Sequence, residues 1–283
     1  MLVYLNGDVL PLAQARISPE DRAFLFADGV YEALLARRGR PLLWAEHERR
    51  LRQGLAALRI DLPRPEELRG ATEELLRRND LLAGDAVVYL QVSRGAAPRA
   101  HAFPSPPVAA TVYMTVRAWP GHPPGMTRDG VAVLTVPDDR WARCDIKSTA
   151  LLANVLAHQR AKEAGAWEAV FVRDGVAIEG SHSNLFAVCD GAIVTYPACN
   201  YILDGVTRGC VLALAGEMGI PARLCALPLP DLLAADEVFL TGTTTEVLPV
   251  VQVDGRRIGG GRPGPITLQL RERYLQRLDR GSG

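Results

Sequence analysis

The sequence predicts an α+β protein of two domains, a smaller N-terminal α/β domain and a larger, β-rich C-terminal domain. Its 283 residues are about twice the usual length of a single domain. Runs rich in β-branched residues occur together with stretches whose apolar residues recur at helical spacing. Residues 119–129 contain three prolines and two glycines and are the predicted linker. The predicted N-terminal domain is therefore residues 1–118, and the predicted C-terminal domain is residues 130–283.

The N-terminal domain begins with a predicted β-hairpin. An Asn-Gly dipeptide at residues 6–7 stands between two short apolar runs and is typical of a two-residue hairpin turn. Residues 29–44 predict a second hairpin. Apolar positions at helical spacing predict helices over residues 45–58 and 65–82. Two further β-rich runs predict strands at residues 87–92 and 109–116.

The C-terminal domain is predicted to combine more strands with three helices. One helix starts near Thr207 and is closed by Gly219, with Pro221 beyond it. The other predicted helices are residues 148–165 and 267–280. The predicted strands are residues 131–136, 169–172, 176–178, 184–189, 192–195 and 237–241.

Composition excludes several classes of protein. Basic and acidic residues number 32 each, so the net charge is zero and does not favour nucleic acid or an anionic membrane as partner. The five cysteines include no CxxC pair and the five histidines no HExxH or HxxxH pair, so the sequence predicts neither a disulfide framework nor a metal site. Because it lacks a signal peptide and a span of about 18 apolar residues, we expect a soluble, cytoplasmic protein.

Lysine is scarce in this chain. Only Lys147 and Lys162 occur among the 32 basic residues. Unlike arginine, lysine can lose its proton and act as a nucleophile. Lys162 lies in a polar stretch typical of an exposed helix face, whereas Lys147 lies between a predicted strand and a predicted helix, where a side chain can face a cleft. Lys147 is therefore the candidate for a Schiff base, with chance retention of a lysine as the alternative.

Three more segments have the composition of a cofactor pocket. Glu179 opens the run Glu-Gly-Ser-His-Ser-Asn, and it could be the anionic partner of a pyridine nitrogen if Lys147 binds pyridoxal phosphate. A polar surface turn is the alternative. Residues 203–208, at the start of a predicted helix, and the hydroxyl-rich residues 241–246 could bind phosphate. Helix capping explains their threonines equally well.

A basic loop follows the predicted strand at residues 87–92. It contains Arg99 and His101, and the planar fork of donors on an arginine suits a substrate carboxylate. An ordinary surface arginine in a loop rich in Pro and Ala is the alternative.

These segments, in this order, resemble the fold-type IV pyridoxal-phosphate enzymes from about residue 3 to residue 280. That family contains branched-chain aminotransferases, D-amino-acid aminotransferases, aminodeoxychorismate lyase and (R)-selective amine transaminases. The run from Tyr89 to Gly95, continued from Pro98 to Pro104, resembles the D-amino-acid aminotransferases in particular. The other matching motifs are Phe26–Glu32, Glu46–Leu51, Arg143–Ser148, Glu179–Asn184, Leu203–Arg208 and Thr241–Glu246.

The resemblance implies a role for each part of the site. Lys147 is the Schiff-base lysine and Glu179 the partner of the pyridine nitrogen, while Tyr31, Arg99 and His101 hold the α-carboxylate of the substrate. It also implies a homodimer in which the basic loop serves the neighbouring subunit's site. The further residues implied for pyridoxal 5′-phosphate are Arg50, Ser183, Asn184, Leu203, Val206, Thr207, Gly242 and Thr243.

The implied activity is transamination of D-amino acids, with D-alanine and 2-oxoglutarate giving pyruvate and D-glutamate. Lys147 takes the α-proton and returns it from one face of the cofactor, which sets the stereochemistry. Gly242 stands where serine is frequent, so one phosphate contact comes from the backbone, and His182 occupies a usually small position. The alternatives are a branched-chain L-amino-acid aminotransferase, aminodeoxychorismate lyase, and a non-catalytic phosphate-binding or scaffold protein.

Overall fold

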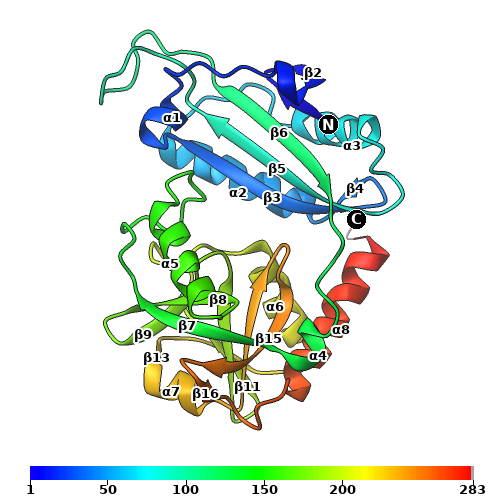
Figure 1. The fold of residues 1–283 in the computed structure, drawn as a ribbon, viewed down its shortest axis with the longest axis vertical. Coiled ribbons are helices and arrows are strands. Elements are labelled where there is room, and N and C mark those ends of the chain that lie inside the picture. Colours follow the sequence, from blue (N-terminus) through cyan, green and yellow to red (C-terminus); the bar gives the residue numbers. More distant parts are fainter. Residues whose placement is uncertain (282–283) are drawn as a thin grey trace. The chain divides into compact units, whose positions relative to one another are not determined.

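The computed structural model describes residues 1–281 and divides them into two compact units (Figure 1). Unit 1 comprises Met1–Gly121 together with Ile146–Ala150. Unit 2 comprises His122–Asp145 and the described residues from Leu151 onward. The division falls at Gly121, inside the segment predicted as a linker, and residues 146–150 return to unit 1 although the sequence placed them in the C-terminal domain.

Unit 1 is a six-stranded antiparallel sheet with helices packed on it. The strand order is β2-β1-β6-β5-β3-β4. Its longest pairing joins β3 to β5, from Gly29 opposite Ser93 to Arg37 opposite Asp85. The elements are β1 (Leu2–Leu5), β2 (Asp8–Pro11), the short 3-10 helix η1 (Leu12–Gln14), α1 (Arg22–Phe26), β3 (Gly29–Arg37), β4 (Arg40–Pro41), α2 (Trp44–Leu58), α3 (Glu67–Arg78), β5 (Asp85–Ser93) and β6 (Thr111–Ala118).

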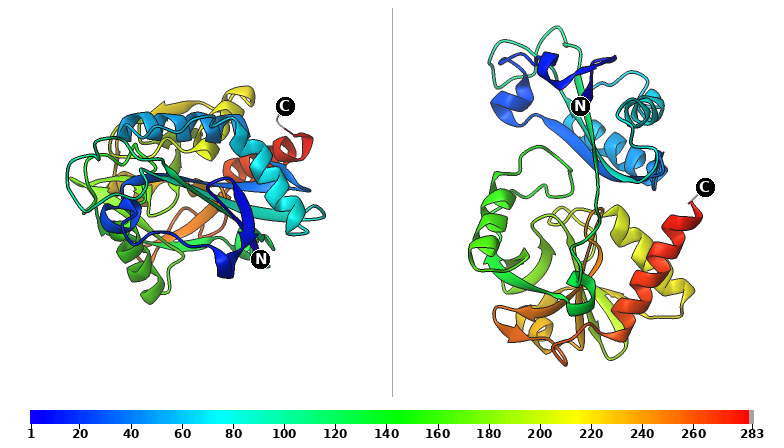
Figure 2. Two further views of the ribbon diagram at one scale, coloured as in Figure 1. Left: turned by 90° about the horizontal axis from the view of Figure 1, so that it is seen from above. Right: turned by 45° about the vertical axis from the view of Figure 1, so that its right-hand side comes forward.

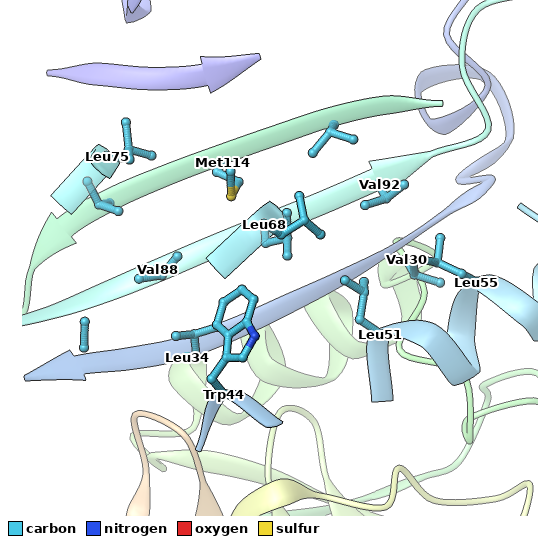
Figure 3. Packing of buried hydrophobic residues seen from close by; sticks show 14 of the residues in the cluster. Val30, Leu34, Trp44, Leu51, Leu55, Leu68, Leu75, Val88, Val92 and Met114 are labelled. Carbon is cyan, nitrogen blue, oxygen red and sulfur yellow. The ribbon is translucent and has the colours of Figure 1, made fainter. Parts of the chain in front are cut away.

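The core of unit 1 lies between the sheet and helices α2 and α3, where apolar side chains from both meet (Figure 3). Alternation along β3 turns Val30, Glu32 and Leu34 toward these helices, because successive strand residues point to opposite faces. The same alternation turns Tyr31 to the other face of the sheet. The remaining labelled residues of this core are Trp44, Leu51, Leu55, Leu68, Leu75, Val88, Val92 and Met114.

Unit 2 is built on a ten-stranded mixed sheet that closes on itself. The order is β12-β11-β10-β14-β15-β7-β8-β9-β13, and β9 also pairs with β10 at Glu179 and Asn184. Helices α6 and α8 lie side by side on it (Figure 2). Its strands are β7 (Val131–Pro137), β8 (Glu168–Arg173), β9 (Val176–Gly180), β10 (Asn184–Cys189), β11 (Ala192–Thr195), β12 (Ala222–Leu224), β13 (Leu227–Pro228), β14 (Glu237–Gly242), β15 (Glu246–Val253) and β16 (Arg256–Arg257). Its helices are α4 (Met126–Asp129), α5 (Leu152–Glu163), α6 (Val206–Glu217), α7 (Leu229–Ala234) and α8 (Pro265–Arg280).

Several elements differ from the sequence expectation, because helix α5 begins later than predicted and eight short or irregular elements were not predicted, namely η1, α1, α4, α7, β12, β13, β15 and β16. Strand β15 was not predicted, because Pro249 interrupts its apolar run and proline disfavours the interior of a sheet. In the fold, Pro249 lies opposite Phe239 of β14 in a fully buried part of the sheet. The helix predicted from residue 148 begins at Leu152, because Ser148 forms a β-bridge with Val30 and Thr149 donates its N–H to the Gly29 carbonyl.

None of the helices within residues 1–281 combines the length and the apolar character needed to span a bilayer.

Candidate active site

Lys147 lies in Ile146–Ala150, the short segment that forms part of unit 1. The Tyr31 N–H donates to the Lys147 carbonyl at 3.0 Å, which fixes this segment along β3. The Lys147 Nζ atom lies 4.2 Å from the centre of the Tyr31 ring. Tyr89 stacks on Tyr31, with its ring centre 5.6 Å from that of Tyr31, and burial raises the pKa of Tyr89 to about 12. The lysine amine therefore lies against the aromatic pair of Tyr31 and Tyr89.

On the opposite face of β3, Glu32 forms a buried ion cluster with helix α2. Its carboxylate accepts two hydrogen bonds from Arg50, at 2.8 and 2.7 Å, and lies 2.7 Å from His47 Nδ1. Burial raises the pKa of Glu32, but Arg50 and His47 outweigh burial and hold it at about 2. Burial lowers the pKa of His47, which favours the neutral imidazole. Arg50, expected at the phosphate, is thus oriented by a carboxylate that stays ionised.

The basic loop that contains Arg99 and His101 is anchored by buried arginines. Arg22 Nη1 donates to the Ala100 carbonyl at 2.6 Å, and the Arg94 guanidinium lies 3.6 Å from the centre of the Phe103 ring. Asp28 pairs with both arginines at 2.8 Å.

The Phe26 ring lies near both side chains expected to bind substrate. The Arg99 guanidinium lies 5.1 Å from the centre of the Phe26 ring, and the His101 ring lies 5.6 Å from it. Both side chains are exposed. The loop therefore presents a cationic and a titratable group from a fixed backbone.

Glu179 is the centre of a buried polar cluster in unit 2. Its Oε1 atom accepts from Arg140 at 2.5 Å, and its Oε2 atom accepts from Asn184 Nδ2 and the Leu203 N–H, both at 3.1 Å. Gly205 allows this packing, because a Cβ atom there would lie 2.0 Å from Asn184 Oδ1. Burial raises the pKa of Glu179 to about 7, although Arg140 opposes this shift. The structure thus brings together three predicted site residues, Glu179, Asn184 and Leu203.

Helix α6 begins at two of the residues predicted to bind the phosphate. Its N-terminal residues are Val206 and Thr207, and Gly205 before them has no side chain with which to cap the first N–H groups. Uncapped N–H groups at a helix N-terminus bind anions. Gly242 ends strand β14 and Thr243 lies in the turn that follows. Ser183, expected at the cofactor, donates to the buried Glu168 carboxylate at 3.0 Å.

Sequence reasoning missed the residues that support Glu179. Arg140 donates to Glu179 and also to Asp138 at 2.8 Å, and Asp138 in turn pairs with Arg173 at 2.8 Å. Both acidic residues are buried, so each needs this counter-charge. The only sequence signal was an Asp-Asp-Arg run just after a predicted strand.

These side chains fit pyridoxal 5′-phosphate, the cofactor implied by the sequence. Lys147 supplies an amine, Glu179 a buried carboxylate for a pyridine nitrogen, and the α6 N-terminus uncapped N–H donors for a phosphate. Each of these groups has the chemistry that a pyridoxal-phosphate enzyme requires.

Comparison with known proteins identifies the family. The model of amino-transferase class IV matches residues 29–253. A curated D-alanine aminotransferase of Staphylococcus haemolyticus is 38% identical over 278 residues, 98% of each chain. One of Bacillus licheniformis is 41% identical over 269 residues, 94% of this chain and 93% of that protein. The solved structure of the T.th. branched-chain amino acid aminotransferase with pyridoxamine 5′-phosphate has a TM-score of 0.88 at 32% identity, covering 97% of this chain and 93% of that one.

The chain belongs to the class IV aminotransferases. This membership confirms the family, the α+β fold class and the aminotransferase activity predicted from the sequence. It also confirms pyridoxal 5′-phosphate as the cofactor and amino acids and 2-oxo acids as the substrates.

Proposed function

We propose that this enzyme transaminates D-amino acids, with D-alanine and 2-oxoglutarate giving pyruvate and D-glutamate. The observation that carries the proposal is the anchored loop with Arg99 and His101, which offers a carboxylate-binding pair on a backbone fixed by Arg22. The names of the two curated relatives, both D-alanine aminotransferases, support it.

In this proposal each site residue has one task. Bound pyridoxal 5′-phosphate supplies an electron sink for the α-carbon of the substrate. Lys147 takes the α-proton at Nζ and returns it, and its contact with the Tyr31 ring holds the amine in place. Glu179 keeps a proton on the pyridine nitrogen, with Asn184 and Leu203 beside it. The phosphate is held by Arg50, by the backbone of Val206, Thr207 and Gly242, and by Thr243.

Ser183 acts on this site through the backbone. Its Oγ atom is bound to Glu168, and a Cβ atom at Gly180 would lie 2.2 Å from it, so the turn between β9 and β10 is tightly closed. This turn sets the register in which Asn184 lies opposite Glu179.

We further propose a cytoplasmic homodimer in which the loop of one subunit completes the site of the other. Arg99 and His101 are exposed, as that arrangement requires. Helix α5 also exposes three apolar side chains, Leu152, Val155 and Leu156, at 73%, 59% and 57%. Exposed apolar side chains on one helix are typical of a face that another protein surface covers.

A branched-chain L-amino-acid aminotransferase is the second candidate. The observation in its favour is the close structural likeness to the T.th. enzyme named a branched-chain amino acid aminotransferase, at a TM-score of 0.88. Because the cofactor residues serve both activities, only the substrate distinguishes them.

The test is the visible absorption spectrum of the cofactor-loaded protein before and after adding D-alanine or L-leucine separately. We expect D-alanine alone to convert the absorption to that of the pyridoxamine form. Conversion by L-leucine alone would replace our proposal with the branched-chain activity. If neither amine changes the spectrum, an aminodeoxychorismate lyase or an amine transaminase becomes the better description.

Two variants locate the chemistry within this assay. Lys147→Ala should remove the lysine-bound cofactor band and turnover, whereas Lys162→Ala, on the exposed face of α5, should retain both. Arg99→Ala should raise KM for D-alanine by about 10-fold or more, because a charged hydrogen bond is worth about 1.5–3 kcal/mol. Arg117→Ala, at the exposed end of β6, is the matched control. An unchanged KM in Arg99→Ala would place the carboxylate elsewhere.

A further inference from the structure

Two histidines converge on the buried carboxylate of Glu168 in unit 2, and the aminotransferase reaction assigns no role to either histidine. His158 comes from α5, Glu168 begins β8, and His182 lies in the turn between β9 and β10. His182 Nδ1 lies 2.7 Å from Glu168 Oε2, and His158 Nδ1 lies 3.6 Å from Glu168 Oε1. One nitrogen or oxygen atom from each of the three residues lies within 4.8 Å of the others.

The Glu168 carboxylate is a fixed negative charge inside the protein. Its side chain has 0% exposure, and it accepts hydrogen bonds from Ser183 Oγ at 3.0 Å, the Ala169 N–H at 2.8 Å and Ser181 Oγ. Although burial raises the pKa of Glu168, the two histidines and Ser181 outweigh burial and keep it well below its usual range. Both of its ion-pair partners are histidines, His158 and His182.

The two histidines face this carboxylate from solvent-accessible positions. Their side chains are 45% and 43% exposed, and their rings meet edge to face with centres 5.0 Å apart. His158 Nδ1 is nevertheless buried and has no hydrogen-bond partner among the described residues. Trp167 covers the His182 ring on another side, with ring centres 5.4 Å apart. The two rings are therefore accessible to a small ion. The His158 Nδ1 atom, which has no hydrogen-bond partner among the described residues, faces the Glu168 carboxylate.

The donor types are those of a transition-metal site, and one of the two measured separations already fits such a site. Zinc binds imidazole nitrogen at about 2.0–2.1 Å and carboxylate oxygen at about 2.0–2.2 Å, so donors around a tetrahedral ion lie about 3.4 Å apart. The separation of 3.6 Å between His158 and Glu168 already meets this requirement. The 2.7 Å separation between His182 and Glu168 is that of a hydrogen bond, and it must widen by about 0.7 Å when a metal replaces the shared proton. The His182 ring is exposed enough to make this movement.

We propose that His158, Glu168 and His182 form a binding site for a borderline divalent metal ion, represented by Zn²⁺, with water completing the coordination shell. Two imidazoles and one carboxylate form a donor set that zinc and its neighbours in the first transition series accept. Because the ligands must be deprotonated, binding releases protons and weakens as the pH falls.

This site could not be found from histidine spacing. His158 and His182 are separated by a strand pair, so no HExxH or HxxxH motif marks them, and the sequence predicts no metal. Pairing of β8 with β9 brings them together. Phe171 lies opposite Glu179 in that pairing, so the turn that follows β9 lies beside Glu168 at the start of β8.

The test is Zn²⁺ binding to the cofactor-loaded protein, measured by competition with a chromophoric chelator, with Co²⁺ absorption as a second probe. We expect one high-affinity Zn²⁺ per chain and a visible Co²⁺ spectrum. His158→Ala and His182→Ser should each weaken Zn²⁺ binding by at least about 10-fold, since even supporting residues around a metal contribute that much. Both side chains are partly exposed, so these variants should fold, which their unchanged cofactor spectrum would verify.

The exposed Cys225 provides the control for binding through thiols. Cys225→Ser should leave the zinc stoichiometry and the Co²⁺ spectrum unchanged. The proposal is overturned if wild-type protein binds no Zn²⁺ at one equivalent, if the histidine variants retain its affinity, or if Cys225→Ser removes binding. None of these outcomes depends on which amino acid the enzyme transaminates.

Discussion

Replacing Glu179 by glutamine should stabilise the cofactor-free protein at alkaline pH. Glu179 is 4% exposed, and burial raises its pKa from the ordinary 4.5 to about 7. Each pH unit of such a shift corresponds to about 1.4 kcal/mol, so ionisation of Glu179 costs the folded protein about 3 kcal/mol. Glutamine has the shape of the protonated acid and avoids this cost. Arg140 keeps Asp138 as its partner at 2.8 Å.

The sign of the pH dependence follows from the raised pKa. The folded state binds the proton more tightly than the unfolded state, so the cost is complete above pH 7 and disappears as the pH falls toward 4.5. Glu179→Gln should therefore be more stable than wild type by about 3 kcal/mol at pH 8.5 and by less than about 1 kcal/mol at pH 5. The same variant should lose transaminase activity, because glutamine cannot keep a pyridine nitrogen protonated.

Urea unfolding of the cofactor-free proteins at both pH values measures this difference. Glu163→Gln, an exposed glutamate at the end of α5, is the control and should change stability by less than about 0.5 kcal/mol. If Glu179→Gln is no more stable than wild type at pH 8.5, or if the difference in stability is the same at pH 5, burial does not raise the free energy of the ionised Glu179 carboxylate and the prediction is wrong.

Two further predictions concern unit 1. Arg22→Ala should raise KM for D-alanine about 10-fold while changing kcat less, because it removes the hydrogen bond to Ala100 that anchors the loop. Steady-state kinetics would check this, and an unchanged KM would show that the loop needs no anchor. Leu75→Ala should lower the free energy of unfolding by about 2–5 kcal/mol, since Leu75 has 0% exposure in the core. Leu82 is 47% exposed, so Leu82→Ala should lower the free energy of unfolding by less than about 1 kcal/mol. Equal losses in a urea titration would contradict the core assignment.

Local patterns in the sequence predicted most elements of the fold. The helix expected at residues 45–58 is α2 (Trp44–Leu58), and the strand expected at residues 184–189 is β10 (Asn184–Cys189). Strand β15 was missed because proline is a strong local signal, and only the surrounding sheet overrides it. The roles of the individual site residues remain predictions, drawn from motifs in which chemistry and spacing coincide.

What the sequence by itself determined is the order of these local segments and the family, and it made Lys147 and Glu179 the candidates for the reaction. Only the tertiary structure decided that residues 146–150 pair with β3, that Arg140 supports Glu179, and that His158 and His182 meet at Glu168. Periodicity and turn signals act over a few neighbouring residues, whereas these contacts join residues 10 to 120 positions apart. Strand pairing and the burial of charge, which the sequence does not show locally, bring them together.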